Sequence, residues 1–131
     1  MAGAMVRGLL ARGVYEPDQL ACTSADDGSG EGLAAETGIR FTTDPDALFG
    51  DARIVILAIK PQQLGALDQS LRAGSRERIV LSILAGTPIA ALSGILPEAR
   101  NVIRAMPNTP GQIGAGITAY TALEPLGEED R

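Results

Sequence analysis

Two segments of this sequence place residues with chemical or conformational potential directly after apolar runs. Lys60 lies between Ile59 and Pro61, so its ammonium group could meet a phosphate or a ribose hydroxyl. Ala85 and Gly86 follow the next apolar run and have almost no side-chain bulk. A flat ring or a ligand backbone could therefore approach the chain closely at that point.

The most informative segment is Val-Ile-Arg-Ala-Met-Pro-Asn-Thr-Pro, residues 102–110. Its apolar start predicts a buried strand, and Pro107 and Pro110 stiffen the polar loop that follows. Asn108, inside that loop, offers both an amide donor and a carbonyl acceptor. Ligands of open α/β sheets bind outside the carboxyl ends of the strands. We therefore expect this loop and the two earlier segments to line one crevice.

Each of these residues also has a plainer interpretation. Lys60 can simply extend from a strand end into water. Ala85–Gly86 can form a tight turn, and Asn108 can serve the local hydrogen bonding of a turn. Thr23 and Ser24, after an earlier short strand, could contact the ribose of an adenosine or its phosphate. The alternative for that pair is again a turn at a strand end.

The composition excludes several kinds of chemistry. The 131 residues include no histidine, which is the commonest acid–base group and metal ligand. No acidic cluster has metal-ligand spacing, so no metal site is predicted. Basic residues are scattered in a chain of net charge −5 with 3% aromatics, which argues against nucleic-acid binding. The single Cys22 excludes an internal disulfide, and we expect it to be an inert core residue. Chemistry carried by a bound cofactor remains.

The pattern of apolar runs predicts the elements that position these residues. Strands are expected at residues 20–23, 39–41, 54–59, 79–84, 101–106 and 117–121. Helices are expected over residues 2–12, before Gly38, and after Asp44, Lys60 and Thr87. The continuous aliphatic runs at 54–59 and 79–84 are typical of strands covered on both faces. Strands that alternate with helices at this spacing predict an α/β fold with a doubly wound, largely parallel sheet.

In this order, the segments resemble the N-terminal dinucleotide-binding domain of pyrroline-5-carboxylate reductases. The resemblance extends to about Ala122. Residues 102–110 carry it most specifically, and the other segments are shared more loosely with related β-hydroxyacid-dehydrogenase-like folds. The remaining matching features are Gly8 with Gly13-Val14, residues 58–61, residues 82–86 and Gly114-Ala115-Gly116.

The resemblance implies a Rossmann-like sheet that binds NADP or NAD, with NADPH favoured by the family. The implied reaction is hydride transfer to the C=N bond of 1-pyrroline-5-carboxylate, which yields L-proline. A protonated cyclic imine is already electrophilic, so this reaction does not require a histidine base, and the lack of histidine is compatible with it. No catalytic residue is predicted. Ser24 would lie near the adenosine ribose, and Ala85 and Asn108 near the nicotinamide. The implied cofactor-binding residues are Ser24, Ala58, Ile59, Lys60, Pro61, Ala85, Gly86 and Asn108.

Two departures from the family pattern affect the expected domains. The family begins with a strand and a glycine-rich loop that holds the pyrophosphate, and Met1-Ala2 match the residues just after that loop. The family also continues into a helical domain that forms the dimer. We therefore expect residues 1–122 to be a Rossmann-like domain incomplete at its N-terminus, with 123–131 a polar tail or the entry to a second domain. The isolated chain is expected to have little reductase activity, and to form a homo-oligomer only if the helical domain is supplied.

Two other functions remain open: a non-catalytic α/β module that binds a nucleotide or a protein, and a related reductase such as a coenzyme F420-dependent one. Residues 106–110 favour the pyrroline-5-carboxylate family over the latter. No apolar run approaches the roughly 18 residues of a membrane span. Because Arg7 and Arg12 also interrupt any signal-peptide core, we expect a cytoplasmic protein. Its expected partner is a small imino acid, with no nucleic acid and no membrane.

Overall fold

The computed structural model describes residues 1–130, and the side chains of these except at positions 67, 68 and 112. The chain forms two compact units. The first unit consists of Met1–Gly50 and Thr109–Gly116. The second unit consists of Asp51–Asn108 and the segment that starts at Ile117. The chain therefore leaves the second unit after Asn108 and re-enters it at Ile117.

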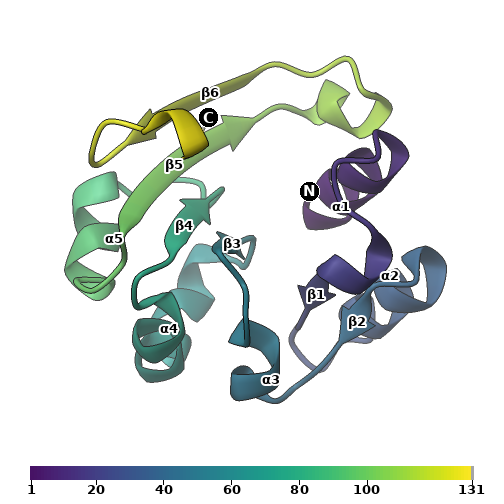
Figure 1. The fold of residues 1–131 in the computed structure, drawn as a ribbon, viewed down its shortest axis with the longest axis horizontal. Helices are drawn as coiled ribbons and strands as arrows, with labels where there is room; N and C mark the ends of the chain where they lie inside the picture. Colours follow the sequence, from purple (N-terminus) through teal and green to yellow (C-terminus); the bar gives the residue numbers. More distant parts are fainter. Residues whose placement is uncertain (131) are drawn as a thin grey trace. The chain divides into compact units, whose positions relative to one another are not determined.

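The first unit contains a small parallel sheet with a helical crossover (Figure 1). Strands β1 and β2 pair in parallel, with Ala21 opposite Arg40 and Cys22 opposite Phe41. Helix α2 connects them, as the sequence predicts. The elements are α1 (Ala2–Ala11), η1 (Pro17–Gln19), β1 (Ala21–Cys22), α2 (Ser29–Thr37), β2 (Arg40–Phe41), α3 (Pro45–Phe49) and η3 (Thr109–Ile113).

Local sequence explains where the helices of the first unit begin and end. Helix α2 ends at Gly38, whose φ of +78° is a left-handed conformation that glycine adopts without strain. Helix α3 begins after Asp44, whose side-chain oxygen accepts a hydrogen bond from the Asp46 N–H at 3.1 Å. Pro45 occupies the first turn, where its missing N–H has no cost. The predicted helix boundaries at Gly38 and Asp44 are confirmed.

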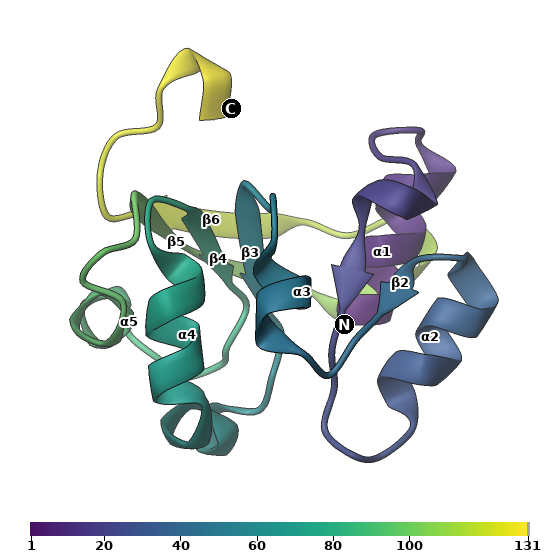
Figure 2. The ribbon, with the colours of Figure 1, turned by 60° about the horizontal axis from the view of Figure 1, so that its bottom comes forward.

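The second unit is a four-stranded sheet in the order β3-β4-β5-β6. The first three strands are parallel, and β6 is antiparallel to β5. Figure 2 shows α4 and α5 on the same side of this sheet, as right-handed crossovers between successive parallel strands require. The elements are β3 (Ile54–Leu57), η2 (Pro61–Leu67), α4 (Asp68–Ser75), β4 (Ile79–Ser82), α5 (Ile89–Ile95), β5 (Asn101–Pro107), β6 (Thr118–Ala122) and η4 (Glu128–Asp130).

Aliphatic side chains from the sheet and its helices form the core of the second unit. Val80 and Leu92 are completely buried, and Val102 is almost so. Leucines of the helical segments supply much of the rest, as the scarcity of aromatic residues requires. The buried apolar residues of this unit are Leu57, Leu64, Leu71, Ile79, Val80, Leu84, Leu92, Leu96, Val102 and Ala105.

The expectation that both aliphatic runs are covered on both faces holds for β4 and is wrong for β3. Ile79 and Val80 are buried on opposite faces of β4, which lies between two strands. Ile54 and Ile56 of β3 are 44% and 40% exposed. The physical reason is that β3 is an edge strand of its sheet, and its Ile54–Ile56 face meets little of the described chain. Among the described residues, β3 pairs only with β4, and β1 only with β2.

Candidate cofactor-binding site

The carboxyl ends of β3, β4 and β5 bring most of the predicted site residues to one edge of the second unit. The register places Leu57 opposite Ser82, and Ser82 opposite Arg104. Strands β3 and β4 therefore end at the same level, while β5 continues as far as Pro107. Residues 58–61, 85–86 and Asn108 follow these three strand ends. This is the edge at which open α/β sheets bind ligands.

Lys60 begins the helical segment after β3 and leaves its ammonium group in solvent. Its backbone N–H donates to Gln63 Oε1 at 2.9 Å, and the Gln63 N–H donates to the Lys60 carbonyl oxygen, also at 2.9 Å. Pro61 follows in the first turn, so the Lys-Pro-x-Gln spacing explains this start. The Lys60 side chain has no ion-pair partner among the described residues. Lys60 and Pro61 are exposed, and Ala58 and Ile59 are half-buried.

Ala85 and Gly86 form an exposed turn after β4. Gly86 has φ +69°, which favours glycine. A Cβ atom built on Gly86 would meet nothing within 4 Å, so the chain itself does not crowd this position. The glycine is therefore required by its backbone conformation. The turn still presents a surface without bulk at the ligand-binding edge.

Asn108 is exposed at the end of β5, and its side chain has a partner within the chain. The Ile117 N–H donates to Asn108 Oδ1 at 3.0 Å. This bond joins the two points at which the chain leaves and re-enters the second unit. The acceptor oxygen of Asn108 is thus occupied in the fold.

Ser24 lies in the first unit, after the carboxyl end of β1. Its hydroxyl accepts a hydrogen bond from the Gly30 N–H at 3.0 Å and donates one to the Ala25 carbonyl at 2.9 Å. The Gly30 N–H belongs to the first turn of α2 and would otherwise lack a partner in that helix. The turn interpretation of Ser24 therefore has direct support, because the side chain stabilises the start of α2.

Cys22 is half-buried, so the expectation of a core thiol is wrong. Its strand has only two residues and pairs on one side, which leaves the side chain partly open. Burial nevertheless raises the pKa of the thiol, and the nearby Glu31 carboxylate raises it further. The described residues contain no group of three or more cysteine and acidic side chains that could hold a metal ion. None of their helices is long and apolar enough to cross a bilayer.

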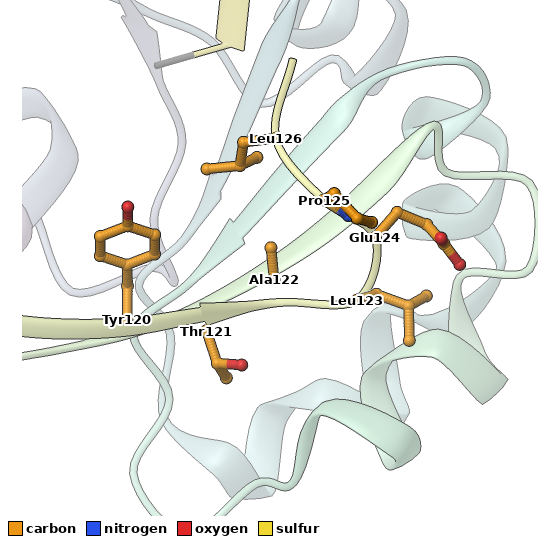
Figure 3. A pocket seen from close by; sticks show the side chains of 7 residues that line it. All are labelled: Tyr120, Thr121, Ala122, Leu123, Glu124, Pro125 and Leu126. Carbon is orange, nitrogen blue, oxygen red and sulfur yellow. The ribbon is translucent and has the colours of Figure 1, made fainter. Parts of the chain in front are cut away.

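A hollow of about 530 Å³ lies at the other end of the sheet. Residues 120–126 line it, and Figure 3 shows Tyr120 and Ala122 on one side of the segment and Thr121 and Leu123 on the other. Because β6 is antiparallel to β5, this segment runs towards Asn101 at the start of β5. The hollow is therefore distinct from the ligand-binding edge. It is lined by one continuous stretch of chain.

Sequence reasoning missed Asn101, a polar residue that is 5% exposed. Its side-chain Nδ2 donates to the Glu124 carbonyl at 3.0 Å, and its Oδ1 accepts from the Glu124 N–H at 3.1 Å. Oδ1 also accepts from the Val102 N–H at 2.8 Å. An asparagine directly before an apolar strand was the available signal. The sequence does not show that its partner lies 23 residues away.

The family model described as "NADP oxidoreductase coenzyme F420-dependent" matches residues 1–86. The chain belongs to this family of NADP oxidoreductases. The matched region includes residues 58–61 and 85–86, and it ends before residues 102–110.

Curated relatives extend the similarity over the rest of the chain. The pyrroline-5-carboxylate reductase of Vibrio alginolyticus is 33% identical over 132 residues, covering 100% of this chain and 48% of the relative. The pyrroline-5-carboxylate reductase of Synechocystis is 33% identical over 122 residues, covering 93% of this chain and 45% of the relative. The predicted resemblance to pyrroline-5-carboxylate reductases is confirmed. The chain spans about half the length of the curated relatives it matches.

Solved structures confirm the Rossmann-like α/β fold. A pyrroline-5-carboxylate reductase from Coxiella burnetii has a TM-score of 0.87 at 28% identity, over 98% of this chain and 48% of the other. The Plasmodium falciparum pyrroline carboxylate reductase with NADP bound has a TM-score of 0.80 at 19% identity, over 97% and 46%. The second likeness supports the fold alone.

Proposed function

We propose that this chain is the cofactor-binding part of a pyrroline-5-carboxylate reductase. In the proposed reaction, hydride passes from NADPH to the C=N carbon of 1-pyrroline-5-carboxylate and L-proline forms. The observation that carries the proposal is the identity of about one third to curated reductases over nearly the whole chain, beyond the region that the family model matches. The proposed setting is proline biosynthesis in the cytoplasm.

The residues at the carboxyl edge of the second unit fit a dinucleotide. Lys60 offers an exposed cation, Gly86 leaves an open surface, and Asn108 is exposed at the end of β5. Bound NADPH would supply the hydride, which no side chain of the protein can provide. The chain's own residues would bind and orient it: Lys60 beside an anionic or hydroxyl group, and Ala85–Gly86 against a flat ring. The proposed cofactor-binding set remains Ser24, Ala58, Ile59, Lys60, Pro61, Ala85, Gly86 and Asn108.

The domain assignment is part of this proposal. Residues 1–122 would form the nucleotide-binding part, and the segment from 123 onward a polar tail or the entry to a second domain. In the structure this segment is held at the start of β5, where Asn101 binds Glu124 and Arg100 pairs with Asp130. Position 131 lies outside the described residues. The binding site for an imino-acid substrate would be completed by residues from the remainder of a full-length reductase. The same remainder would form the contacts of a homo-oligomer. The 131 residues alone are therefore expected to show little turnover.

A grafted enzyme tests the reaction. Residues 1–131 replace the matching half of the Vibrio alginolyticus reductase, and NADPH oxidation is followed with and without 1-pyrroline-5-carboxylate. We expect substrate-dependent oxidation by the graft and little by the isolated chain. A graft whose circular dichroism and thermal transition match those of the parent enzyme, yet which shows no substrate-dependent oxidation, would contradict the proposal.

A second candidate is an F420-dependent NADP oxidoreductase, which the description of the family model favours. The same graft and the isolated chain distinguish the two when reduced coenzyme F420 and NADP are supplied. Reduction of NADP by that coenzyme would favour the second candidate. Residues 102–110, which lie outside the match to the family model, favour the first.

A further inference from the structure

The hydrogen bond between Asn108 and Ile117 continues the pairing of β5 with β6 by one step. In the ladder, Ile103 lies opposite Ala122 and Pro107 lies opposite Thr118. The next opposing residues are therefore Asn108 and Ile117. Their bond is made by the Asn108 side-chain oxygen, which accepts from the Ile117 N–H at 3.0 Å.

The position of this bond matches the alternation of an antiparallel ladder. Opposing residues alternate between hydrogen-bonded and non-hydrogen-bonded pairs. At the far end, the Leu123 N–H donates to the Val102 carbonyl at 2.8 Å. Asn108 and Ile117 are separated from Val102 and Leu123 by an even number of positions along the chain. The alternation therefore makes them a hydrogen-bonded pair, like Val102 and Leu123. The Asn108 side chain accepts the N–H that the ladder presents.

Strand β6 needs such a bond because its side chains define its register poorly. Thr118, Ala119, Tyr120 and Thr121 are all exposed. A strand without a buried face is weakly held against slipping along its neighbour. At the other end of the same ladder, the Asn101 side chain forms hydrogen bonds with the Glu124 backbone. Asn101, at the start of β5, and Asn108, just after its end, thus bind the residues that flank the two ends of β6.

We propose that Asn108 is a positioning residue whose side-chain oxygen, acting through the Ile117 N–H, fixes the end of β5 at the ligand-binding edge. The loop 106–110 then presents a constant backbone to the ligand. The inference rests on the proposed function for its ligand, NADPH, whereas the bond itself rests on geometry. It assigns the work of Asn108 to Oδ1 and not to the NH2 group.

Two nearly isosteric substitutions separate the oxygen from the NH2 group. Asn108→Asp keeps an acceptor at the same place and removes the donor, whereas Asn108→Leu removes both. The first measurement is amide hydrogen exchange at Ile117 in the 131-residue chain. We expect Asn108→Leu to accelerate this exchange about fivefold, the factor that one net hydrogen bond supplies. Asn108→Asp should leave it within twofold, and Leu123, at the far end of the ladder, serves as the internal control.

The second measurement is the dissociation constant for NADPH at physiological ionic strength. We expect Asn108→Leu and Ile117→Pro each to weaken binding about fivefold, because both remove the bond between Oδ1 and the Ile117 N–H, and the second leaves the Asn108 NH2 group in place. Unchanged exchange at Ile117 in Asn108→Leu would overturn the proposal. So would an Ile117→Pro variant that binds NADPH as tightly as the wild type, because the Asn108 NH2 group would then be the working group. If neither the wild-type chain nor its graft into the Vibrio alginolyticus reductase binds NADPH, the proposed function fails, and exchange at Ile117 still decides whether the bond exists.

Discussion

The side chain of Asn101 forms hydrogen bonds to both backbone polar groups of Glu124, at 3.0 and 3.1 Å. These bonds hold the chain after β6 against the start of β5 in the same way that a ladder pair would. Asn101 and Val102 are buried, whereas Glu124 is exposed, so the Val102 N–H is the partner with little access to water once the side chain is lost. The arrangement makes Asn101 a determinant of stability far from the ligand-binding edge.

Replacing Asn101 by Leu should destabilise the protein by about 1–3 kcal/mol, because the buried Val102 N–H and the part-buried backbone groups of Glu124 lose their partner. Asn101→Asp keeps the acceptor for the Glu124 and Val102 N–H groups but brings a carboxylate oxygen against the Glu124 carbonyl in a buried site, so it should also destabilise the protein. Urea unfolding followed by circular dichroism measures both. NADPH affinity should survive either substitution where the protein is folded. Equal stability of the Leu variant and the wild type would show that these bonds contribute nothing.

Two glycines of α2 provide a matched pair for a packing prediction. A Cβ on Gly30 would lie 2.6 Å from Phe41 Cε2 and 2.7 Å from Ser24 Oγ, whereas a Cβ on Gly32 would meet nothing within 4 Å. Gly30→Ala should therefore destabilise the first unit by about 1–3 kcal/mol. Gly32→Ala should stabilise it by up to about 1 kcal/mol, because alanine favours the helix. Thermal unfolding tests the opposite signs, and a loss of stability in both variants would contradict the packing argument.

Cys22 should react slowly with alkylating agents near neutral pH. Burial and the Glu31 carboxylate raise the pKa of its thiol, so the reactive thiolate is scarcer than in the unfolded chain at the same pH. Because the pKa of the Cys22 thiol is higher in the folded than in the unfolded chain, its protonated form contributes to the free energy of unfolding. That contribution is complete below the pKa of the unfolded thiol and is lost as the pH rises through the pKa of the folded one. Mass spectrometry of iodoacetamide labelling with and without urea measures the difference. Glu31→Gln should speed labelling modestly, and equal rates in the folded and urea-unfolded protein would refute the prediction.

Lys60 should contribute to NADPH affinity through its charge. Lys60→Gln is expected to weaken binding about tenfold at low salt, with a smaller effect at high salt because exposed charges are screened. Arg53 provides the control, because it is also an exposed cation and precedes the same strand at its amino end. Arg53→Gln should leave affinity unchanged. Equal losses in the two variants would indicate a general effect of net charge.

The sequence predicted most of the elements because their signals are local. The aliphatic runs gave the three parallel strands, and Gly38, Asp44 and Pro61 marked helix boundaries that the structure reproduces. The exposure of Ile54 and Ile56 was not predictable from the run itself. An apolar strand is buried only by neighbours, and the residues 54–57 do not encode how many neighbours they have.

The candidate site was predictable in position and less so in role. Strand ends in a parallel sheet meet at one edge, so residues 58–61, 85–86 and Asn108 could be grouped from the sequence. The sequence did not show that Asn108 accepts a bond from Ile117 or that Ser24 caps Gly30. Both partners lie several residues away, beyond the reach of local patterns.

Titration of the isotopically labelled chain with NADPH, followed at each backbone amide by NMR, tests the central claim most directly. Binding at the carboxyl edge of the second unit should produce saturable shifts that are largest at the amides of Ile59, Lys60, Gly86 and Asn108. Titration with NADH under the same conditions shows whether the 2′-phosphate contributes. Shifts centred on residues 120–126, or no saturable shift at the strand ends, would contradict the claim that this edge holds the cofactor.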